Sequence, residues 1–256
     1  MRIMSYDRSS FKISDLILSK LKKNSNSSIH SRRVKTLILS SGGKDSILAL
    51  HRAYELGFSI DGIITILPED SESMLYHTYN VIHVEKIAKS IGIKWYGVEA
   101  KKEEEERALE KTLLQLDAEV LISGEIASNY QRKKFDRITK SANMGHYTPL
   151  WGMEPHEVLT EIILMKIDAI IVAVAAYGLG KEWLGKRLTE KSIGELLKLS
   201  EKYHFNPSGE GGDLESLVLD APLYKKRLRP VNVVKTWEKD RGYLEIEEVV
   251  LEDKVR

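Results

Sequence analysis

The sequence predicts an α/β protein in which a parallel sheet with crossover helices is followed by a smaller α/β or α+β domain. From Val34 onward, short apolar runs alternate with helix-like periodic segments, which is typical of parallel strands joined by helices. Around Pro155 this layout restarts, and the chain ends in two alternating segments on either side of a turn. We therefore expect a first domain over 34–150 and a second over 151–256.

The first domain is expected to hold four strands and a weaker fifth. The strands are predicted at 34–40, 59–67, 93–99, 118–124 and 146–152. Helices are predicted after the first strand up to Gly57, over 79–92, over 103–116, and from about Asn129. In the first of these helices, Ile47, Leu50, His51 and Tyr54 are expected to fall on one helical face.

The second domain is expected to combine helices with an antiparallel hairpin. Helices are predicted at 156–166 and 192–203, and strands at 168–176 and 214–222. Residues 231–252 alternate on either side of a turn at Lys239 to Gly242, which predicts the hairpin.

Composition and charge exclude several classes of site and partner. Lys+Arg 39 against Asp+Glu 38 leaves a formal charge of +1, so no global field recruits nucleic acid or an anionic membrane. The longest apolar stretch, 167–176, is too short to span a bilayer. Residues 1–33 are basic and rich in Ser and Asn, which predicts a flexible extension without a secretory signal. We expect a cytoplasmic protein with no membrane and no stable nucleic-acid partner.

The stretch LILSSGGKDSILAL, residues 37–50, holds the strongest signal for a binding site. A strand, a glycine turn and a helix together present unpaired N–H groups and the positive helix end at one point, which favours an anion. Lys44 adds a positive charge, and Ser41 and Ser46 add hydroxyl donors. The turn therefore predicts a phosphate site, although a serine or Asp45 serving only as a helix cap is the structural alternative.

The turn does not match two common phosphate motifs. The P-loop pattern would require Gly in place of Ile38 and Ser or Thr in place of Asp45, and the dinucleotide fingerprint G-x-G-x-x-G also fails. The signature SGGKDS resembles that of the ATP pyrophosphatase superfamily, the PP-loop enzymes. This resemblance implies a Rossmann-like, HUP-type sheet and an ATP-binding domain over 34–150, in which the loop grips the β and γ phosphates. It also implies cleavage of ATP between the α and β phosphates.

Several further stretches resemble one branch of that superfamily, the diphthine–ammonia ligase family. These stretches are PEDSESMLYHTYN (68–80), SGEIASNYQR (123–132), PLWGMEP (149–155) and NPSGEGGDLESLVLDAPLY (206–224). The chain has no cysteine, which weighs against the thiolation and zinc-binding branches and against a glutaminase, so free ammonia is the simplest nitrogen donor. Where the family usually has Glu, an aromatic residue, Glu and Thr, this chain has Asp213, Leu214, Glu215 and Ser216.

The resemblance implies ATP-dependent amidation of diphthine on elongation factor two. ATP and Mg²⁺ would activate the diphthine carboxylate as an acyl-adenylate, and ammonia would displace AMP after pyrophosphate has left. The second domain would then bind the substrate. The sequence leaves the oligomeric state open, and a homodimer is one of the alternatives.

The resemblance also implies the residues of the site. For ATP these are Ser41, Gly42, Gly43, Lys44, Asp45, Ser46, Gly124 and Glu125, with Asp45 also holding Mg²⁺. The catalytic residues would be Lys44, Asp45 and Glu210, with Glu210 collecting ammonium and taking its proton. The substrate would contact His77, Ser128, Tyr130, Gln131, Gly211, Gly212, Asp213 and Glu215.

Simpler structural roles remain open for several of these residues. The three acids at 210, 213 and 215 could hold Mg²⁺, ammonium or the trimethylammonium group of diphthine, or they could face water on a β-bulge. Ser128 could only cap a helix, and His77 could be an ordinary loop residue. Two other functions compete: a PP-loop ligase acting on a small molecule or tRNA, and a regulator that binds ATP without hydrolysing it.

Overall fold

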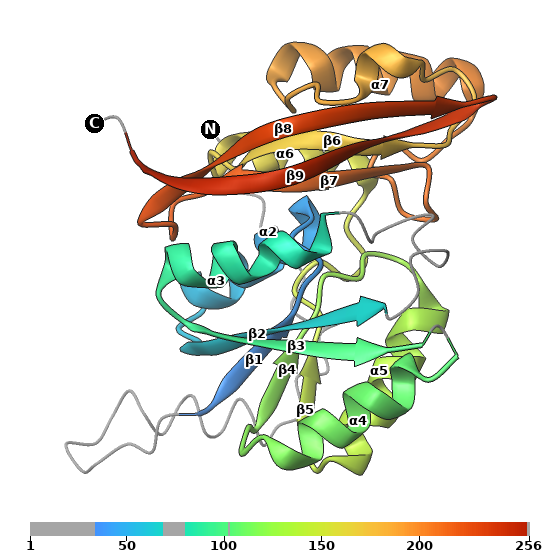
Figure 1. Ribbon diagram of the computed structural model, residues 1–256. Coiled ribbons are helices and arrows are strands. Elements are labelled where there is room, and N and C mark those ends of the chain that lie inside the picture. The colour runs from blue at the N-terminus through green and yellow to red at the C-terminus, as the bar shows by residue number, and fades with distance from the viewer. Residues whose placement is uncertain (1–33, 69–79, 102, 255–256) are drawn as a thin grey trace, which may run out of the picture.

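Two β-sheets lie on either side of a pair of helices, and further helices cover the outer face of each sheet (Figure 1). The computed structural model describes residues 34–68, 80–101 and 103–254. The predicted extension over 1–33 and the predicted substrate residue His77 lie outside these ranges. No helix within them is long and apolar enough to cross a membrane.

The first sheet is parallel throughout, as predicted, with the strand order β3-β2-β1-β4-β5. Its strands are β1 (Thr36–Leu39), β2 (Ile60–Pro68), β3 (Lys94–Ala100), β4 (Val120–Ile122) and β5 (Gly145–Tyr147). The order reverses at β1, where successive strands are added on opposite sides. In open sheets of this kind, ligands bind beside the carboxyl ends of the strands at such a reversal.

Within the described ranges, four helices and one 3-10 turn join these strands. They are α2 (Lys44–Glu55), η3 (Val81–His83), α3 (Val84–Ile91), α4 (Glu105–Gln115) and α5 (Asn129–Ser141). Helix α3 ends at Gly92, which has a φ of 88° and so adopts the left-handed conformation that commonly terminates helices. Helices α4 and α5 cover one face of the sheet through a small core that includes Leu109, Leu113 and Ile138.

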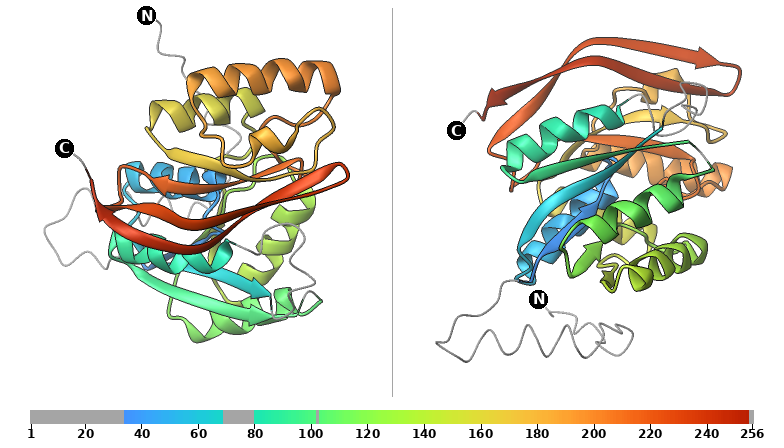
Figure 2. Two further views of the ribbon diagram at one scale, coloured as in Figure 1. Left: turned by 45° about the horizontal axis from the view of Figure 1, so that its top comes forward. Right: turned by 60° about the horizontal axis from the view of Figure 1, so that its bottom comes forward.

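The second sheet is antiparallel, with the strand order β7-β6-β9-β8. Its elements are α6 (Pro155–Leu164), β6 (Asp168–Val174), η4 (Lys181–Trp183), α7 (Glu190–Tyr203), β7 (Leu214–Asp220), β8 (Lys226–Glu238) and β9 (Arg241–Asp253). Strands β8 and β9 form the predicted hairpin, which curves across the sheet and over α3 (Figure 2). The predicted fold class is therefore confirmed, with an α+β arrangement in the second half.

Helices α2 and α3 form a layer that both sheets share. In α2 the buried residues are Ile47, Leu48, Ala49, Leu50, His51 and Ala53, together with Lys44. They surround the helix, because α2 contacts β1 and β4 on one side and β7 and α6 on the other. Burial therefore extends beyond the one helical face that the sequence indicates, and Tyr54 on that face is 56% exposed.

Residues at the start of the α3 segment attach this layer to the C-terminal hairpin. The buried Asn80 donates from Nδ2 to the carbonyl oxygen of Leu244 (2.8 Å) and accepts from the N–H of Ile246 (3.0 Å). Nε2 of His83 lies 2.7 Å from the carbonyl oxygen of Ile246. Strand β9 is thus held by side chains from the first half of the chain.

Replacing Asn80 should therefore loosen the hairpin. We expect Asn80→Ala to lower the free energy of unfolding by about 2–3 kcal/mol, because it leaves a buried N–H and a buried carbonyl of β9 without these partners. Chemical denaturation measures this loss. Asn129→Ala, at an exposed position, is the control and should change stability by less than about 0.5 kcal/mol. Equal effects of the two substitutions would contradict the prediction.

Candidate active site

The glycine turn between β1 and α2 is shaped by its neighbours in the tertiary structure. Gly42 has a φ of 81°, and a Cβ there would lie 3.1 Å from side-chain atoms of Ile87 and of Leu217. Gly43 is the N-cap residue of α2, and no side-chain cap bond is formed there. The alternative in which a serine or Asp45 only caps this helix is therefore not what the structure adopts.

Strand β7 holds this turn in place. The N–H of Val218 donates to the carbonyl oxygen of Gly42 (3.0 Å), and the N–H of Lys44 donates to Oγ of Ser216 (3.1 Å). Oγ of Ser40 lies 2.7 Å from Oγ of Ser46. The loop and the start of the helix are therefore ordered before any ligand binds, as a preorganised anion site requires.

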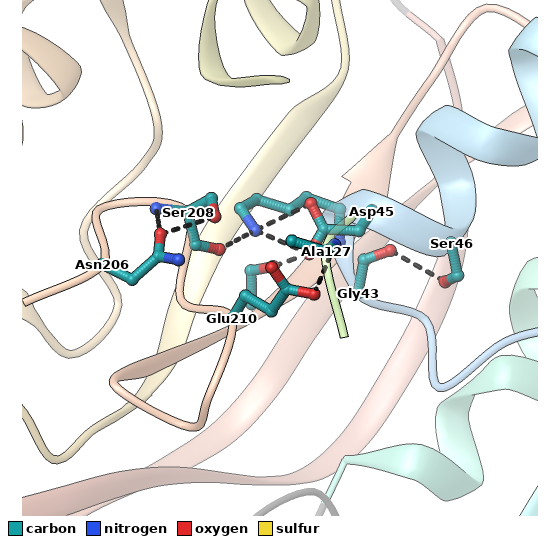
Figure 3. A network of polar contacts seen from close by, with 9 residues as sticks. Gly43, Asp45, Ser46, Ala127, Asn206, Ser208 and Glu210 are labelled. Carbon is teal, nitrogen blue, oxygen red and sulfur yellow. Dashed lines mark hydrogen bonds and ion pairs between the residues drawn. The ribbon is translucent and has the colours of Figure 1, made fainter. Parts of the chain in front are cut away.

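Lys44 lies at the centre of the polar network of the site (Figure 3). Its side chain is only 2% exposed, and Nζ donates to both carboxylate oxygens of Asp45 (2.9 and 2.8 Å) and to the carbonyl oxygen of Ser208. Burial raises the pKa of Asp45, and the neighbouring Lys44 ammonium opposes that rise. The ammonium therefore lies beside the positive end of α2 and is held there by the Asp45 carboxylate and the Ser208 carbonyl.

The glycine-rich loop over 206–213 folds against this network. The N–H and Oγ of Ser208 both donate to Oδ1 of Asn206, and the N–H of Asn206 donates to Oδ2 of Asp213. Oε1 of Glu210 accepts from the N–H groups of Ala127 and Ser128, each at 2.8 Å (Figure 3). Glu210 thereby links the loop to the start of α5.

These elements line a cleft of about 980 Å³. The predicted site residues that line it are Ser41, Gly43, Lys44, Asp45, Ser46, Gly124, Glu125, Gln131, Glu210, Gly211, Gly212, Asp213 and Glu215. Residues from β1, α2, α5, β7 and the loop that follows β4 thus meet at the carboxyl end of the parallel sheet. The cleft is large enough for a nucleotide together with part of a second substrate.

Three other predicted residues lie outside the cleft lining. Gly42 is buried and packs against α3 and β7. Ser128 is the N-cap residue of α5, where Oγ accepts from the N–H of Gln131 (3.3 Å), so the capping role is realised. Tyr130 is 74% exposed on α5 and does not line the cleft.

The acids of the second loop do not form one metal-binding cluster. In the described part of the chain, no group of three or more His, Cys, Asp or Glu side chains is placed to hold a metal ion. Glu215 is buried, and burial raises its pKa to about 9, so it is a neutral acid at pH 7. A neutral acid donates a hydrogen bond more readily than it holds a cation.

A second polar chain, which the sequence analysis did not identify, leads from Glu125 away from the cleft. Oγ of Ser123 donates to Oε2 of Glu125 and lies 2.6 Å from Nε2 of His146. Nδ1 of His146 lies 2.7 Å from Oδ1 of Asp136. Burial raises the pKa of Glu125, and the hydrogen bond from Ser123 opposes that rise.

The residues that sequence reasoning missed carried little local signal. Ser208 and Ser216 lie within the stretch that resembled the ligase family, but nothing in their spacing pairs them with residues about 170 positions earlier. His146 and Asp136 have no motif around them. Only the packing of α5 against β5 brings these two side chains together.

Gly124 should be intolerant of any side chain. A Cβ there would lie 2.8 Å from the backbone carbon of Asp45 and 2.8 Å from the backbone nitrogen of Ser46. We expect Gly124→Ala to displace the start of α2 and to weaken ATP binding about tenfold or more, which is about 1.4 kcal/mol. Isothermal titration with ATP measures the affinity. Gly194→Ala is the control, because a Cβ at Gly194 meets nothing within 4 Å; its affinity should match that of the wild type.

The buried Glu215 should make stability depend on pH. Because its pKa is about 9 in the folded protein and 4.5 ordinarily, the folded state binds the extra proton, and stability falls as pH rises between these values. Glu215→Gln cannot ionise. We expect Glu215→Gln to become more stable relative to the wild type as pH rises across this window. Thermal unfolding measures the difference in stability, and a difference that stays constant with pH would contradict the prediction.

Comparisons with known proteins identify the family. A model described as the diphthamide synthase N-terminal domain matches residues 34–145, and one described as the diphthamide synthase C-terminal domain matches residues 154–251.

Among curated relatives, the Schizosaccharomyces pombe protein named diphthine–ammonia ligase is 34% identical over 76% of this chain, which spans 36% of that protein. The proteins of that name from Rattus norvegicus and Bos taurus are each 32% identical, over 77% and 87% of this chain and over 82% and 94% of their own lengths. The resemblance predicted from the SGGKDS turn and the second glycine loop is thus confirmed, and the chain belongs to the diphthamide synthase family.

Proposed function

We propose that the chain is an ATP-dependent ligase that amidates diphthine on elongation factor two, with ammonia as the nitrogen donor. Membership of the diphthamide synthase family supports the reaction class. The observation that carries the proposal is that the N-terminus of α2, with the buried Lys44, opens into a cleft whose other wall is the glycine loop of the second half. This places an anion site and a second binding surface in one cavity.

The turn over Ser41–Ser46 is suited to the β and γ phosphates of ATP. The positive N-terminal end of α2, the Lys44 ammonium and the serine hydroxyls all favour anionic oxygens. The close approach of Gly124 to the backbone of Asp45 brings the β4 loop beside this turn. The rest of the nucleotide would therefore lie toward β4 and Glu125.

The site also fits Mg²⁺ held jointly by protein and nucleotide. Asp45 lies in the first turn of α2 and lines the cleft. Since the described residues provide no three-residue cluster, Asp45 would supply one ligand while phosphate oxygens and water supply the others, as Mg²⁺ in nucleotide sites usually requires. The ion would offset charge on the phosphates during transfer.

The chemistry proceeds in two steps. The diphthine carboxylate attacks the α-phosphorus of ATP, so that pyrophosphate leaves and an acyl-adenylate forms. Ammonia then attacks the acyl carbon, AMP leaves with the bond electrons, and the nitrogen of the new bond releases one proton to water to give the neutral amide. Lys44 stabilises charge developing on the phosphates in the first step, and the neutral Glu215 can donate a hydrogen bond to a substrate oxygen in the cleft.

The second loop provides room for the substrate. Gly211 and Gly212 have φ values of 98° and 92°, and a Cβ at either position meets nothing within 4 Å, so both present open backbone on the cleft. The modified histidine of a large protein could enter there. Glu210 lines the cleft, and its Oε1 accepts two backbone N–H groups, so in the predicted role as the base for ammonium it would use its other oxygen.

The proposal is tested by direct conversion of the protein substrate. We expect purified protein, ATP, Mg²⁺ and heavy-nitrogen ammonium to convert diphthine on elongation factor two to the labelled amide, with release of AMP and pyrophosphate. Because replacing OH by heavy-nitrogen NH2 leaves the mass almost unchanged, mass spectrometry of the peptide that carries the modified histidine compares the products formed from light and from heavy ammonium. A pyrophosphate assay measures the other product. Lys44→Ala should lower the rate by about 10²-fold or more, whereas Lys111→Ala, on the exposed side of α4, should leave it unchanged.

The outcomes separate the competing functions. Pyrophosphate without labelled amide would identify an adenylating ligase with a different substrate. Binding of ATP without pyrophosphate, in the presence of a factor shown to carry diphthine, would favour a regulator and would overturn the proposal.

A further inference from the structure

Four side chains connect the cleft to the protein surface through continuous hydrogen bonds. The mechanism above assigns no role to three of them, Ser123, His146 and Asp136. We call them the polar chain: Glu125, Ser123, His146 and Asp136, in order from the cleft outward. Glu125 and Ser123 line the cleft and are 8% and 1% exposed. The His146 side chain is 4% exposed, and that of Asp136 is 52% exposed.

We propose that the polar chain is a proton relay that takes a proton from ammonium in the cleft and so supplies neutral ammonia for the amidation. This inference rests on the proposed function. Ammonium has no free electron pair and cannot attack an acyl carbon, so one proton must leave before the carbon–nitrogen bond forms. A group that removes it must face the cleft and must have somewhere to pass the proton.

The geometry allows two hydrogen-bonding states, one with the extra proton on Glu125 and one with it on His146. In the first, a neutral Glu125 donates to Oγ of Ser123, and the Ser123 hydroxyl donates to Nε2 of His146. In the second, Glu125 is a carboxylate that accepts from Ser123, and a His146 imidazolium donates from Nε2. Nδ1 of His146 donates to Asp136 in both states. Moving two protons across Ser123 interconverts them.

Amide formation from ammonium releases two protons. The polar chain takes the first, and the second passes from the nitrogen to water in the cleft once the carbon–nitrogen bond has formed. Ammonium transfers a proton to the Glu125 carboxylate and leaves ammonia with its electron pair free. The proton passes through Ser123 to His146, which becomes an imidazolium, and Glu125 is a carboxylate again. After the product leaves, the proton returns by the same path to water in the open cleft.

The groups around the polar chain favour this proton transfer. Burial raises the pKa of Glu125, which makes its carboxylate a better base. Carboxylate oxygens of Glu125 and Asp136 lie 3.9 and 2.7 Å from the two ring nitrogens of His146. The ring edge of Phe135 packs against the imidazole, with ring centroids 6.1 Å apart. Glu210, by contrast, has its Oε1 bonded to two backbone N–H groups and no such path is seen from it.

The test compares two nucleophiles in the amidation assay with elongation factor two. Ammonium must lose a proton before it attacks, whereas hydroxylamine is largely uncharged at neutral pH. We expect His146→Gln, which keeps a polar side chain but cannot become a cation, to lower the ammonium-dependent rate about 10²-fold and to lower the hydroxylamine-dependent rate far less. Asp136→Asn should shift the same ratio in the same direction by a smaller factor.

The pH profile provides a second measurement. Without the relay, the protein depends on neutral ammonia already present in solution, so the ammonium-dependent rate of His146→Gln should rise about tenfold per pH unit near neutrality. The wild-type rate should rise less steeply. Asp240→Asn, whose side chain is 78% exposed on the β8–β9 turn, is the control and should follow the wild type.

The outcomes are distinguishable. Equal losses with both nucleophiles, or a His146→Gln profile parallel to that of the wild type, would overturn the relay while leaving the ligase reaction intact. Failure of the wild type to form amide from either nucleophile would overturn the proposed function and the relay with it. Thermal unfolding checks that each variant folds. If His146→Gln does not fold, Asp136→Asn, at a half-exposed position, provides the comparison of the two nucleophiles.

Discussion

The start of helix α2 is held by strand β7, and the active site depends on this contact. The hydroxyl of Ser216 accepts from the N–H of Lys44, and the N–H of Val218 donates to the carbonyl of Gly42, across more than 170 positions of sequence. A glycine turn has many conformations in an isolated chain, so its N–H groups would seldom converge. Bonding to β7 selects one conformation. Because the anion site and the second glycine loop share that strand, both sides of the cleft are positioned by the same element.

The shared helical layer gives this contact its rigidity. Helix α2 is buried against both sheets, and α3 packs against the first sheet while Asn80 and His83 next to it bond to β9. Relative movement of the two sheets would expose apolar side chains on several sides of α2 at once, which is costly. The two halves of the chain therefore behave as one packed body around the cleft, which favours precise placement of a nucleotide beside a second substrate.

Burial separates the acids of the cleft into different roles. Glu215 is deeply desolvated and stays neutral at pH 7, whereas Asp45 sits beside the Lys44 ammonium, and Glu210 is occupied by backbone donors. Acids that look equivalent in sequence thus become a hydrogen-bond donor, a partner for a cation and a structural link. Glu125 differs from all three because Ser123 and His146 lie behind it and provide a path for protons.

The sequence by itself determined the fold class, most of the strands and helices, and the glycine turn between β1 and α2, because these follow from local periodicity and from turn chemistry within a few residues. Its family resemblance also located the second glycine loop. What only the tertiary structure decided is which side chains meet: Ser216 with the turn, Glu210 with the start of α5, and Asp136 with His146. The tertiary structure also decided which residues are buried. Tyr54 follows the helical period yet is exposed, and α2 is buried on more sides than a single apolar stripe predicts. Periodicity describes how one element repeats, whereas pairing and desolvation depend on residues brought together from distant parts of the chain.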